Sequence, residues 1–291
     1  MATFEMERPD NRVEYDFWYT SSDDRALDFL RDFKENNRLF GNKVYMRPHF
    51  AFWTCDNCDD AIYKRDCFGE GDYCAINEKN LNTTGVEILN EDLRQYCIYE
   101  NLERTGSTDL WWDYIAEFHQ QCYNEVTDDC SRNAHEKIGL DWITTQRCVD
   151  STFVGSGEKW QQKNQMFSDE KEYYHQYGPS FFPGLVVNNR TYMGSLDPEN
   201  VFSAICAGFK DQPKACKTHV LGENAPSGIS ISKLLLIIAG LVAINIVLIL
   251  VYRKYAKKEV NEQMQMHINS AVSQYFALQD KDSRSAKPLV Q

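Results

Sequence analysis

The chain has 291 residues, with 43 Asp and Glu against 31 Lys and Arg, which gives a formal net charge of −12. Residues 253–291 hold seven Lys and Arg and four Asp and Glu, so the residues before them carry −15. This sign argues against nucleic acid as a partner, because binding to phosphates requires a basic surface. An acidic surface that keeps the protein soluble is favoured over one that attracts basic ligands or calcium.

The first residues, MATFEMERPDNRVEYD, lack the basic start and the apolar core of a signal peptide. The hydrophobic segment, the cysteines and the glycosylation sequons described below all require that residues before the segment cross a membrane. We therefore expect an incomplete N-terminus, and the alternative is that a later hydrophobic segment acts as the signal anchor. Residues 1–12 are predicted to be an N-terminal segment outside the folded domain.

A strand, a helix and a second strand are predicted next. Val13 to Thr20 alternates and is rich in aromatic residues, which is typical of a strand. Ser21 to Asp24 forms a helix-capping cluster, apolar residues at helical spacing follow it, and Gly41 is predicted to end the helix. Lys43 to Thr54 predicts the second strand, in which Pro48 requires an edge position, an end or a bulge.

Residues 55–74 contain four cysteines and show neither helical nor strand period, so we predict a loop held by disulfides. Cys55-Asp56-Asn57-Cys58 resembles the CxxC of a thioredoxin. A catalytic CxxC follows a strand and begins a helix, whose N-terminus stabilises the thiolate. The residues after Cys58 are acidic without an apolar face, and the fitting strand-to-helix junction lies at Ser21 to Asp24. We therefore predict structural disulfides.

From about residue 86 to 177 the pattern is helical, and no strand is predicted within it. Gly178 to Gly194 restores the strand signal, with Asn188-Asn189 as the turn between two short runs. Asp197-Pro198-Glu199 then opens a helix, and residues 210–230 are predicted to be a polar stalk.

This order of elements predicts an α/β fold: a disulfide-rich, thioredoxin-like domain over residues 13–216, with a helical insertion at about 86–177. Pro183 occupies the place of the cis-proline that precedes the hairpin in that fold, and the alternative is a trans proline at a strand start. A stalk (217–233), a transmembrane helix (234–252) and a cytoplasmic tail (253–291) are predicted to follow.

No catalytic set stands out. His49, His119, His135 and His175 are scattered, without HExxH spacing, and are predicted to be surface or core histidines. The chain has no Walker loop and no GxSxG motif. We expect no catalytic residue, no metal site, no cofactor and no enzymatic activity.

Leu234 to Tyr252 is predicted to cross a membrane, because its 19 residues contain one strongly polar member, Asn245, and a helix of that length covers roughly 28 Å. A buried soluble helix is the alternative. Basic residues crowd its C-terminal end, at positions 253, 254, 257 and 258, whereas Lys233 alone immediately precedes it. The positive-inside rule then places the C-terminus in the cytoplasm.

The cysteines and the glycosylation sequons agree with that topology. An oxidising lumen favours disulfides, and all ten cysteines precede the span. They are Cys55, Cys58, Cys67, Cys74, Cys97, Cys122, Cys130, Cys148, Cys206 and Cys216, and their pairing is left open by the sequence. The sequons begin at Asn82 and Asn189, on the same side of the span.

Several motifs occur in the order found in one family: VEYDFWYTSSDD, PHFAFWTC, GDYCA, NEDLRQYC, LWWDYIAEF, GLD before Cys148, FPGLVVNNRTYMGSL and AICAGF. From Val13 to Cys216 the chain resembles the central luminal domain of the plant vacuolar sorting receptors. These are type I membrane proteins that carry soluble hydrolases from the Golgi to a vacuole or lysosome. The resemblance implies a thioredoxin-like domain that binds cargo or a cargo-binding partner.

The resemblance continues in the tail. Tyr275-Phe276-Ala277-Leu278 is a YxxΦ signal, in which Tyr275 and Leu278 dock into two pockets of a clathrin adaptor as an extended strand. An amphipathic tail helix is the alternative interpretation. The chain departs from the family pattern in lacking a protease-associated domain before Val13, in having a short stalk instead of EGF-like repeats, and in Cys58. Cargo specificity and calcium dependence are therefore not carried over.

The leading hypothesis is thus a receptor-like sorting protein of Golgi, endosomal or prevacuolar membranes, with luminal cargo, a clathrin adaptor and membrane lipid as partners. The groove beside Phe182, Pro183 and Gly184 is the candidate peptide platform, because thioredoxin-like folds hold extended peptides there. The alternatives are a membrane-anchored thiol oxidoreductase that uses Cys55 and Cys58, and a structural membrane protein that keeps the receptor's domain.

Overall fold

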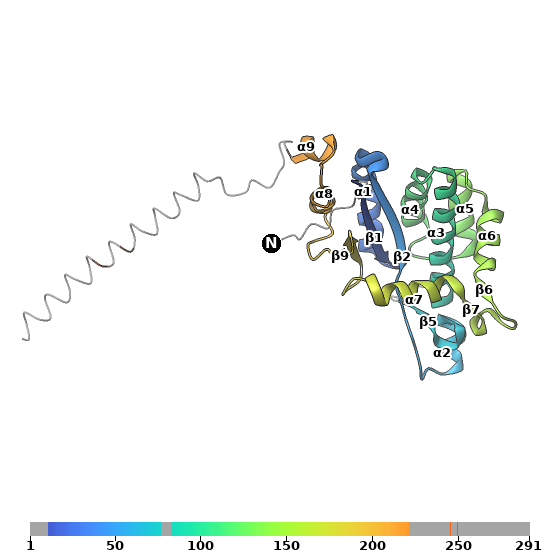
Figure 1. Ribbon diagram of the computed structural model, residues 1–291. Helices are drawn as coiled ribbons and strands as arrows, with labels where there is room; N and C mark the ends of the chain where they lie inside the picture. Colours follow the sequence, from blue (N-terminus) through green and yellow to red (C-terminus); the bar gives the residue numbers. More distant parts are fainter. Residues whose placement is uncertain (1–10, 77–82, 221–244, 246–248, 250–291) are drawn as a thin grey trace, which may run out of the picture. The chain divides into compact units, whose positions relative to one another are not determined.

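The computed structural model describes residues 11–76, 83–220, 245 and 249 (Figure 1). The chain divides into two units, Met1–Gly222 and Glu223–Gln291, and the labelled helices and strands belong to the first. Within the described ranges, no helix is both long and apolar enough to span a bilayer. The predicted span, Leu234 to Tyr252, lies outside those ranges apart from Asn245 and Ile249.

The described residues form short strands and longer helices in mixed order. The strands are β1 (Val13–Tyr19), β2 (Val44–Phe50), β3 (Phe52–Trp53), β4 (Cys67–Phe68), β5 (Tyr73–Ala75), β6 (Phe153–Val154), β7 (Lys163–Asn164), β8 (Gly184–Val187) and β9 (Arg190–Thr191). The α-helices are α1 (Asp24–Phe40), α2 (Asp60–Asp66), α3 (Gly85–Thr105), α4 (Asp109–Gln121), α5 (Asp128–Ile138), α6 (Trp142–Ser151), α7 (Gln165–Tyr177), α8 (Pro198–Ala207) and α9 (Lys214–Val220).

The central sheet has the strand order β2-β1-β8-β9, with β1 parallel to β2 and antiparallel to β8. This confirms the predicted strand, helix and strand at the start of the domain. Pro48 is tolerated because β2 lies at the edge of the sheet. The turn between β8 and β9 also forms as predicted, since Asn188 and Asn189 have φ angles of 46° and 61°, which suit a tight hairpin.

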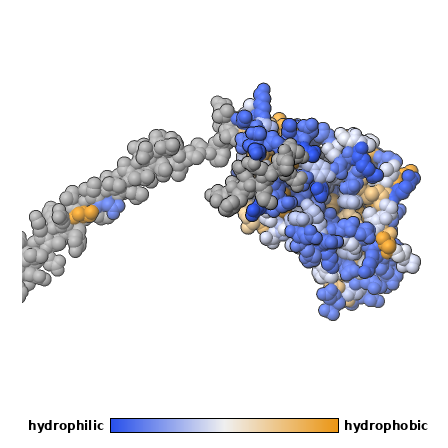
Figure 2. All heavy atoms as spheres, viewed as in Figure 1, coloured by the Kyte–Doolittle hydropathy of each residue, from blue (hydrophilic) through white to orange (hydrophobic). Residues whose placement is uncertain are grey.

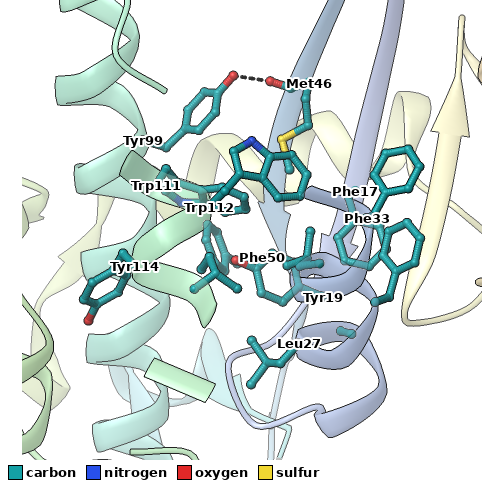
Figure 3. Close-up of a cluster of buried hydrophobic side chains, with 14 of the residues drawn as sticks. Phe17, Tyr19, Leu27, Phe33, Met46, Phe50, Tyr99, Trp111, Trp112 and Tyr114 are labelled. Carbon is teal, nitrogen blue, oxygen red and sulfur yellow. Dashed lines mark hydrogen bonds between the residues drawn. The ribbon is translucent and has the colours of Figure 1, made fainter. Parts of the chain in front are cut away.

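The core lies against one face of β1. Every residue of this strand except Glu14 is buried, and Val13, Tyr15, Phe17 and Tyr19 share this face because they occupy alternate positions. On this face Phe17 contacts Phe29 of α1, with ring centroids 5.1 Å apart. Figure 3 shows that α1 and β1 share this core with the aromatic residues of α3 and α4, where the Tyr99 hydroxyl also donates to the Met46 carbonyl of β2. The core therefore joins the sheet to the helical insertion.

The insertion is built mainly from α3, α4, α5 and α6, which stand together beside the sheet (Figure 1). Thr84 and Glu87 form a reciprocal capping box at the start of α3, and Gly106 ends that helix in the left-handed region. Two disulfides brace the insertion: Cys97–Cys148 joins α3 to α6, and Cys122–Cys130 joins the end of α4 to α5. The outer surface in the view of Figure 2 is mainly hydrophilic.

Three sequence predictions are wrong in detail. The Cys55–Cys74 segment is not a plain loop: Asp59 caps α2, and Cys67 pairs with Cys74 across β4 and β5. The strands β6 and β7 interrupt the stretch predicted as purely helical. The proposed stalk at 210–230 contains α9, which the Cys206–Cys216 disulfide ties to α8. Each missed element is seven residues or shorter and therefore contains too few residues to show a helical or strand repeat.

Replacing Cys97 and Cys148 by Ala should lower the free energy of unfolding by about 4 kcal/mol, because this disulfide closes a long loop in the unfolded chain. Replacing Cys206 and Cys216 by Ala, whose disulfide spans 10 residues, should lower it by about 3 kcal/mol. Guanidinium denaturation of both variants measures the difference. An equal or larger loss for the short loop would contradict the prediction.

Candidate functional site

A cleft of about 220 Å³ opens where the ends of β1 and β2 meet α7. Its lining comes from four separate parts of the chain: Trp18; Phe50, Ala51, Phe52, Trp53 and Thr54; Glu170, Lys171, Tyr174 and His175; and Phe182. The lining is mainly aromatic, with a few polar groups, which is the usual character of a binding site. The cleft is therefore the candidate functional site.

Aromatic rings define its walls. The ring of Tyr174 lies 5.4 Å from that of Trp18 and 5.5 Å from that of Phe182, measured between centroids. Trp53 of the lining keeps 44% of its surface exposed, and Phe181, the residue before Phe182, keeps 39%. The indole N–H of Trp18 is buried and has no hydrogen-bond partner among the described residues. The site thus offers mainly apolar, aromatic contact area.

The predicted groove residues lie at this cleft or beside it. The Phe182–Pro183 peptide bond is cis, as predicted. Phe182 lines the cleft, whereas Pro183 is buried and Gly184 begins β8. A Cβ at Gly184 would lie 2.4 Å from the carbonyl oxygen of Phe181, so the position requires glycine. A role for these residues in cargo binding stays a prediction.

A buried ionic cluster lies next to the cleft. His49 Nδ1 donates to the Glu170 carboxylate at 2.9 Å, and Nε2 donates to Asp16 Oδ1 at 3.3 Å. Burial lowers the pKa of His49, but the charge of Glu170 and hydrogen bonds to both carboxylates raise it to about 9. The ring is therefore protonated at neutral pH, and its centroid also lies 4.4 Å from that of Trp18 and 4.8 Å from that of Tyr173.

The junction between β1 and α1 is closed to solvent. Thr20, Ser21 and Ser22 are all buried. The Asp92 carboxyl of α3 accepts from the Ser21 backbone N–H at 2.8 Å and from the Thr20 hydroxyl at 3.4 Å. Burial raises the pKa of Asp92 to about 8, although its hydrogen bonds from Ser21 act in the opposite direction. Hydroxyl groups and a protonated carboxyl therefore occupy the place where a redox thioredoxin fold carries its cysteines.

All ten cysteines are paired. The disulfides are Cys55–Cys58, Cys67–Cys74, Cys97–Cys148, Cys122–Cys130 and Cys206–Cys216. The expectation that no helix follows Cys58 is wrong, because Asp59 accepts from the backbone N–H of Ile62 and caps α2 there. However, the preceding strand β3 belongs to a separate three-stranded sheet, so this CxxC does not lie at the junction between β1 and α1.

The other predicted site residues are dispersed. Asn189 is exposed in the hairpin turn, while Asn82, Tyr275 and Leu278 lie outside the described residues. Across residues 11–76 and 83–220, no group of His, Cys, Asp and Glu is arranged to hold a metal ion. Of the histidines, His175 lines the cleft and His135 lies in the core against Tyr114.

Sequence reasoning missed most of the cleft. The aromatic strands that supply Trp18 and Trp53 were recognised only as strands, and the tyrosines of α7 only as part of a helical stretch. The buried ionic cluster had one signal in the sequence. Asp16 and His49 are ionisable residues that interrupt runs of apolar residues in predicted strands. Buried charges of that kind are uncommon unless they are paired.

These features define a thioredoxin-like domain without cysteines at the usual redox position and with a cleft beside its cis-proline. Residues 13–206 match the family model described as the vacuolar sorting receptor thioredoxin-like domain. The chain therefore belongs to the vacuolar sorting receptor family.

The curated relatives are longer proteins. The chain is 30% identical over 238 residues to vacuolar-sorting receptor 1 of Pisum sativum, with 74% of this chain and 37% of that protein covered. Vacuolar-sorting receptor 4 of Arabidopsis thaliana gives the same identity and coverage. The chain thus matches little more than a third of the length of these receptors.

Similarity to solved structures is weak. The oxidoreductase DsbA from Xylella fastidiosa superposes with a TM-score of 0.37 at 12% identity, covering 69% of this chain and 86% of that one. The oxidoreductase NmDsbA1 from N. meningitidis gives a TM-score of 0.38 at 9% identity, covering 70% and 89%. Values this low carry no conclusion about activity.

The free energy of unfolding should fall as the pH rises from 7 to 8.5. The folded domain keeps a proton on Asp92 up to about pH 8 and on His49 up to about pH 9, their raised pKa values, whereas the unfolded chain has largely lost both by pH 7. Each group lowers stability by about 1.4 kcal/mol per pH unit until its folded pKa is passed. The lowered pKa of His135 acts in the opposite direction, but only below its ordinary value of 6.5.

Asp92→Asn mimics the protonated carboxyl and should reduce this slope, so that the variant is more stable than the wild type at pH 8.5. Urea denaturation at pH 7 and 8.5 measures both proteins. Identical slopes for the variant and the wild type would show that Asp92 is already ionised in the folded state.

Proposed function

We propose that the protein is a single-pass type I sorting receptor that carries soluble luminal cargo, such as hydrolases, from the Golgi to a vacuole or lysosome. Membership of the vacuolar sorting receptor family is the observation that carries this proposal. Because the chain spans 37% of its curated relatives, the role of the whole receptor comes to it only as a proposal.

Several observations support a luminal position for residues 13–216. All ten cysteines are disulfide-bonded, which suits an oxidising compartment. Asn189, in a glycosylation sequon, is exposed in the β8–β9 turn and accessible to modification. The apolar run at 234–252 and the basic residues after it would then place the tail in the cytoplasm of Golgi, endosomal or prevacuolar membranes.

The cleft is the proposed cargo platform. Its aromatic walls would bury an apolar side chain of an extended peptide. The ammonium group of Lys171 donates to the Thr54 hydroxyl at 3.2 Å at the same site, so a positive charge also faces the bound segment. A folded cargo protein with an exposed tail or loop matches these features.

Replacing both Trp53 and Phe182 by Ala should weaken cargo binding at least about tenfold, because each ring supplies contact area at the cleft. In cells that depend on this receptor, vacuolar hydrolases should then be secreted, as measured by their activity in the medium. Ile143→Ala is the matched control, since this apolar side chain is 64% exposed on α6. Normal retention of hydrolases by the double variant would exclude the cleft as the platform.

The tail signal has a separate test. Tyr275→Ala should abolish adaptor binding and shift the protein towards the cell surface, because the tyrosine fills one of the two adaptor pockets. Tyr255→Ala is the control, since Tyr255 has Lys258 instead of a bulky apolar residue three positions on. Surface biotinylation measures both variants. Equal surface levels would contradict a role for Tyr275.

A further inference from the structure

The Cys55–Cys58 disulfide closes the shortest loop among the five in the described domain. Its cysteines are 3 residues apart, against separations of 7, 8, 10 and 51 in the others. A disulfide stabilises a fold mainly by restricting the unfolded chain, and the restriction grows with loop length. The Cys55–Cys58 bond therefore contributes least to holding the domain together.

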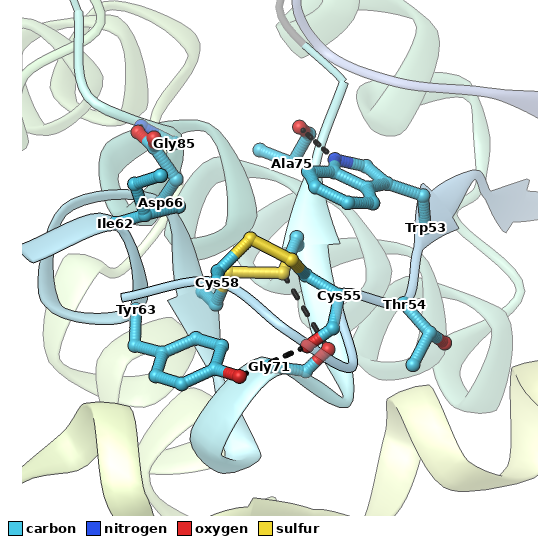
Figure 4. Close-up of a disulfide and its surroundings, with 12 residues drawn as sticks. Trp53, Thr54, Cys55, Cys58, Ile62, Tyr63, Asp66, Gly71, Ala75 and Gly85 are labelled. Atoms are coloured by element: carbon cyan, nitrogen blue, oxygen red, sulfur yellow. Dashed lines mark hydrogen bonds between the residues drawn. A yellow bond between two sulfur atoms is a disulfide. The ribbon is translucent and has the colours of Figure 1, made fainter. Parts of the chain in front are cut away.

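Cys55 keeps its place without the disulfide. Its backbone N–H donates to the Gly71 carbonyl at 2.8 Å, and its carbonyl accepts from the Tyr63 hydroxyl at 3.2 Å (Figure 4). A Cβ at Gly71 would approach both Cys55 and Tyr63 to 2.4 Å, so the glycine permits this close packing. Opening the sulfur–sulfur bond would leave these contacts in place.

Cys58 is the accessible member of the pair. Both cysteines pack against the Cys67–Cys74 disulfide, but Cys55 is 9% exposed whereas Cys58 is half-buried among exposed neighbours. The bond also lies beside the cleft, since Trp53 and Thr54, which line it, directly precede Cys55. A chain bound in the cleft would therefore pass close to an accessible disulfide.

We propose that Cys55–Cys58 is a thiol–disulfide exchange site for thiols of neutral or positive charge, such as a cysteine in a neutral or basic peptide. This goes beyond the sorting role, which needs no redox chemistry. An incoming thiolate attacks Sγ of Cys58, a new sulfur–sulfur bond forms, and Cys55 leaves as a thiolate that takes up a proton. A second thiol of the same peptide then attacks the mixed disulfide and releases Cys58.

The two steps oxidise two peptide thiols to a disulfide and reduce Cys55 and Cys58 to thiols. A small-molecule disulfide of the oxidising compartment would restore the pair by the reverse exchange. Lys171 places an ammonium group on the hydroxyl of Thr54, the residue that precedes Cys55.

The preference for charge follows from the neighbours of Cys58. Asp56, Asp59 and Asp60 are all exposed around it. The two cations of α2 are engaged elsewhere: Lys64 lies over the Trp160 ring at 5.3 Å, and Arg65 pairs with Asp66 at 2.5 Å. The field at Cys58 is therefore negative, which repels anionic thiols and attracts cationic ones.

The test treats the full-length protein, in detergent, with three small thiols: cationic cysteamine, neutral 2-mercaptoethanol and anionic 2-mercaptoethanesulfonate. Samples are quenched by alkylation, and peptide mass spectrometry follows each disulfide with time. Rates are divided by those measured for an uncharged model disulfide, which removes differences in nucleophilicity. Cys55 and Cys58 should be labelled first, with cysteamine about tenfold faster than the sulfonate.

Charge is tested by Asp56→Asn combined with Asp60→Asn, which should bring the cysteamine and sulfonate rates closer together. Neither residue is the N-cap of α2, which is Asp59, so the cap is kept. Folding is tested by replacing both Cys55 and Cys58 by Ser, which should leave the melting temperature almost unchanged. The proposal is overturned if another disulfide opens as early, if the three thiols react alike, or if the serine variant loses its fold.

Discussion

A charged histidine held between two carboxylates determines how the cleft is formed. His49 of β2 contacts Asp16 of β1 and Glu170 of α7, and all three side chains are buried. Removing a charge from water is costly unless a partner lies within hydrogen-bond distance, so these residues hold the sheet and α7 in one arrangement. The backbone N–H of Phe50 also donates to Glu170 at 3.3 Å, which connects the cluster directly to the cleft wall.

The two faces of the sheet are stabilised by different means. On the face of Phe17, aromatic residues of β1 pack against α1 and the helical insertion. On the face of Trp18, stacked rings and the ionic cluster join the sheet to α7. Apolar packing tolerates small shifts, whereas hydrogen-bonded charges require defined distances. A binding surface beside the second face is consequently held in a narrow range of geometries.

The parts of the fold that could be predicted from sequence are those with local signals. Alternating aromatic residues identified β1, the serine and aspartate cluster identified the start of α1, and Asn188-Asn189 identified the hairpin turn. The cleft could not be predicted in the same way, because its residues come from segments more than 100 positions apart, as with Trp18 and Tyr174. The sequence also does not determine the Cys55–Cys58 pairing, since ten cysteines are compatible with many pairings.

The closed junction between β1 and α1 limits what a cysteine placed there could do. A thiol introduced at Ser21 would lie in the interior, where that residue is fully buried and its backbone N–H bonds to Asp92. Such a thiol would be shielded from solvent and from any macromolecular substrate, and its ionisation would be opposed by burial. Redox chemistry at this junction would thus require α3, whose Asp92 and Ile88 bond to Ser21, to move away.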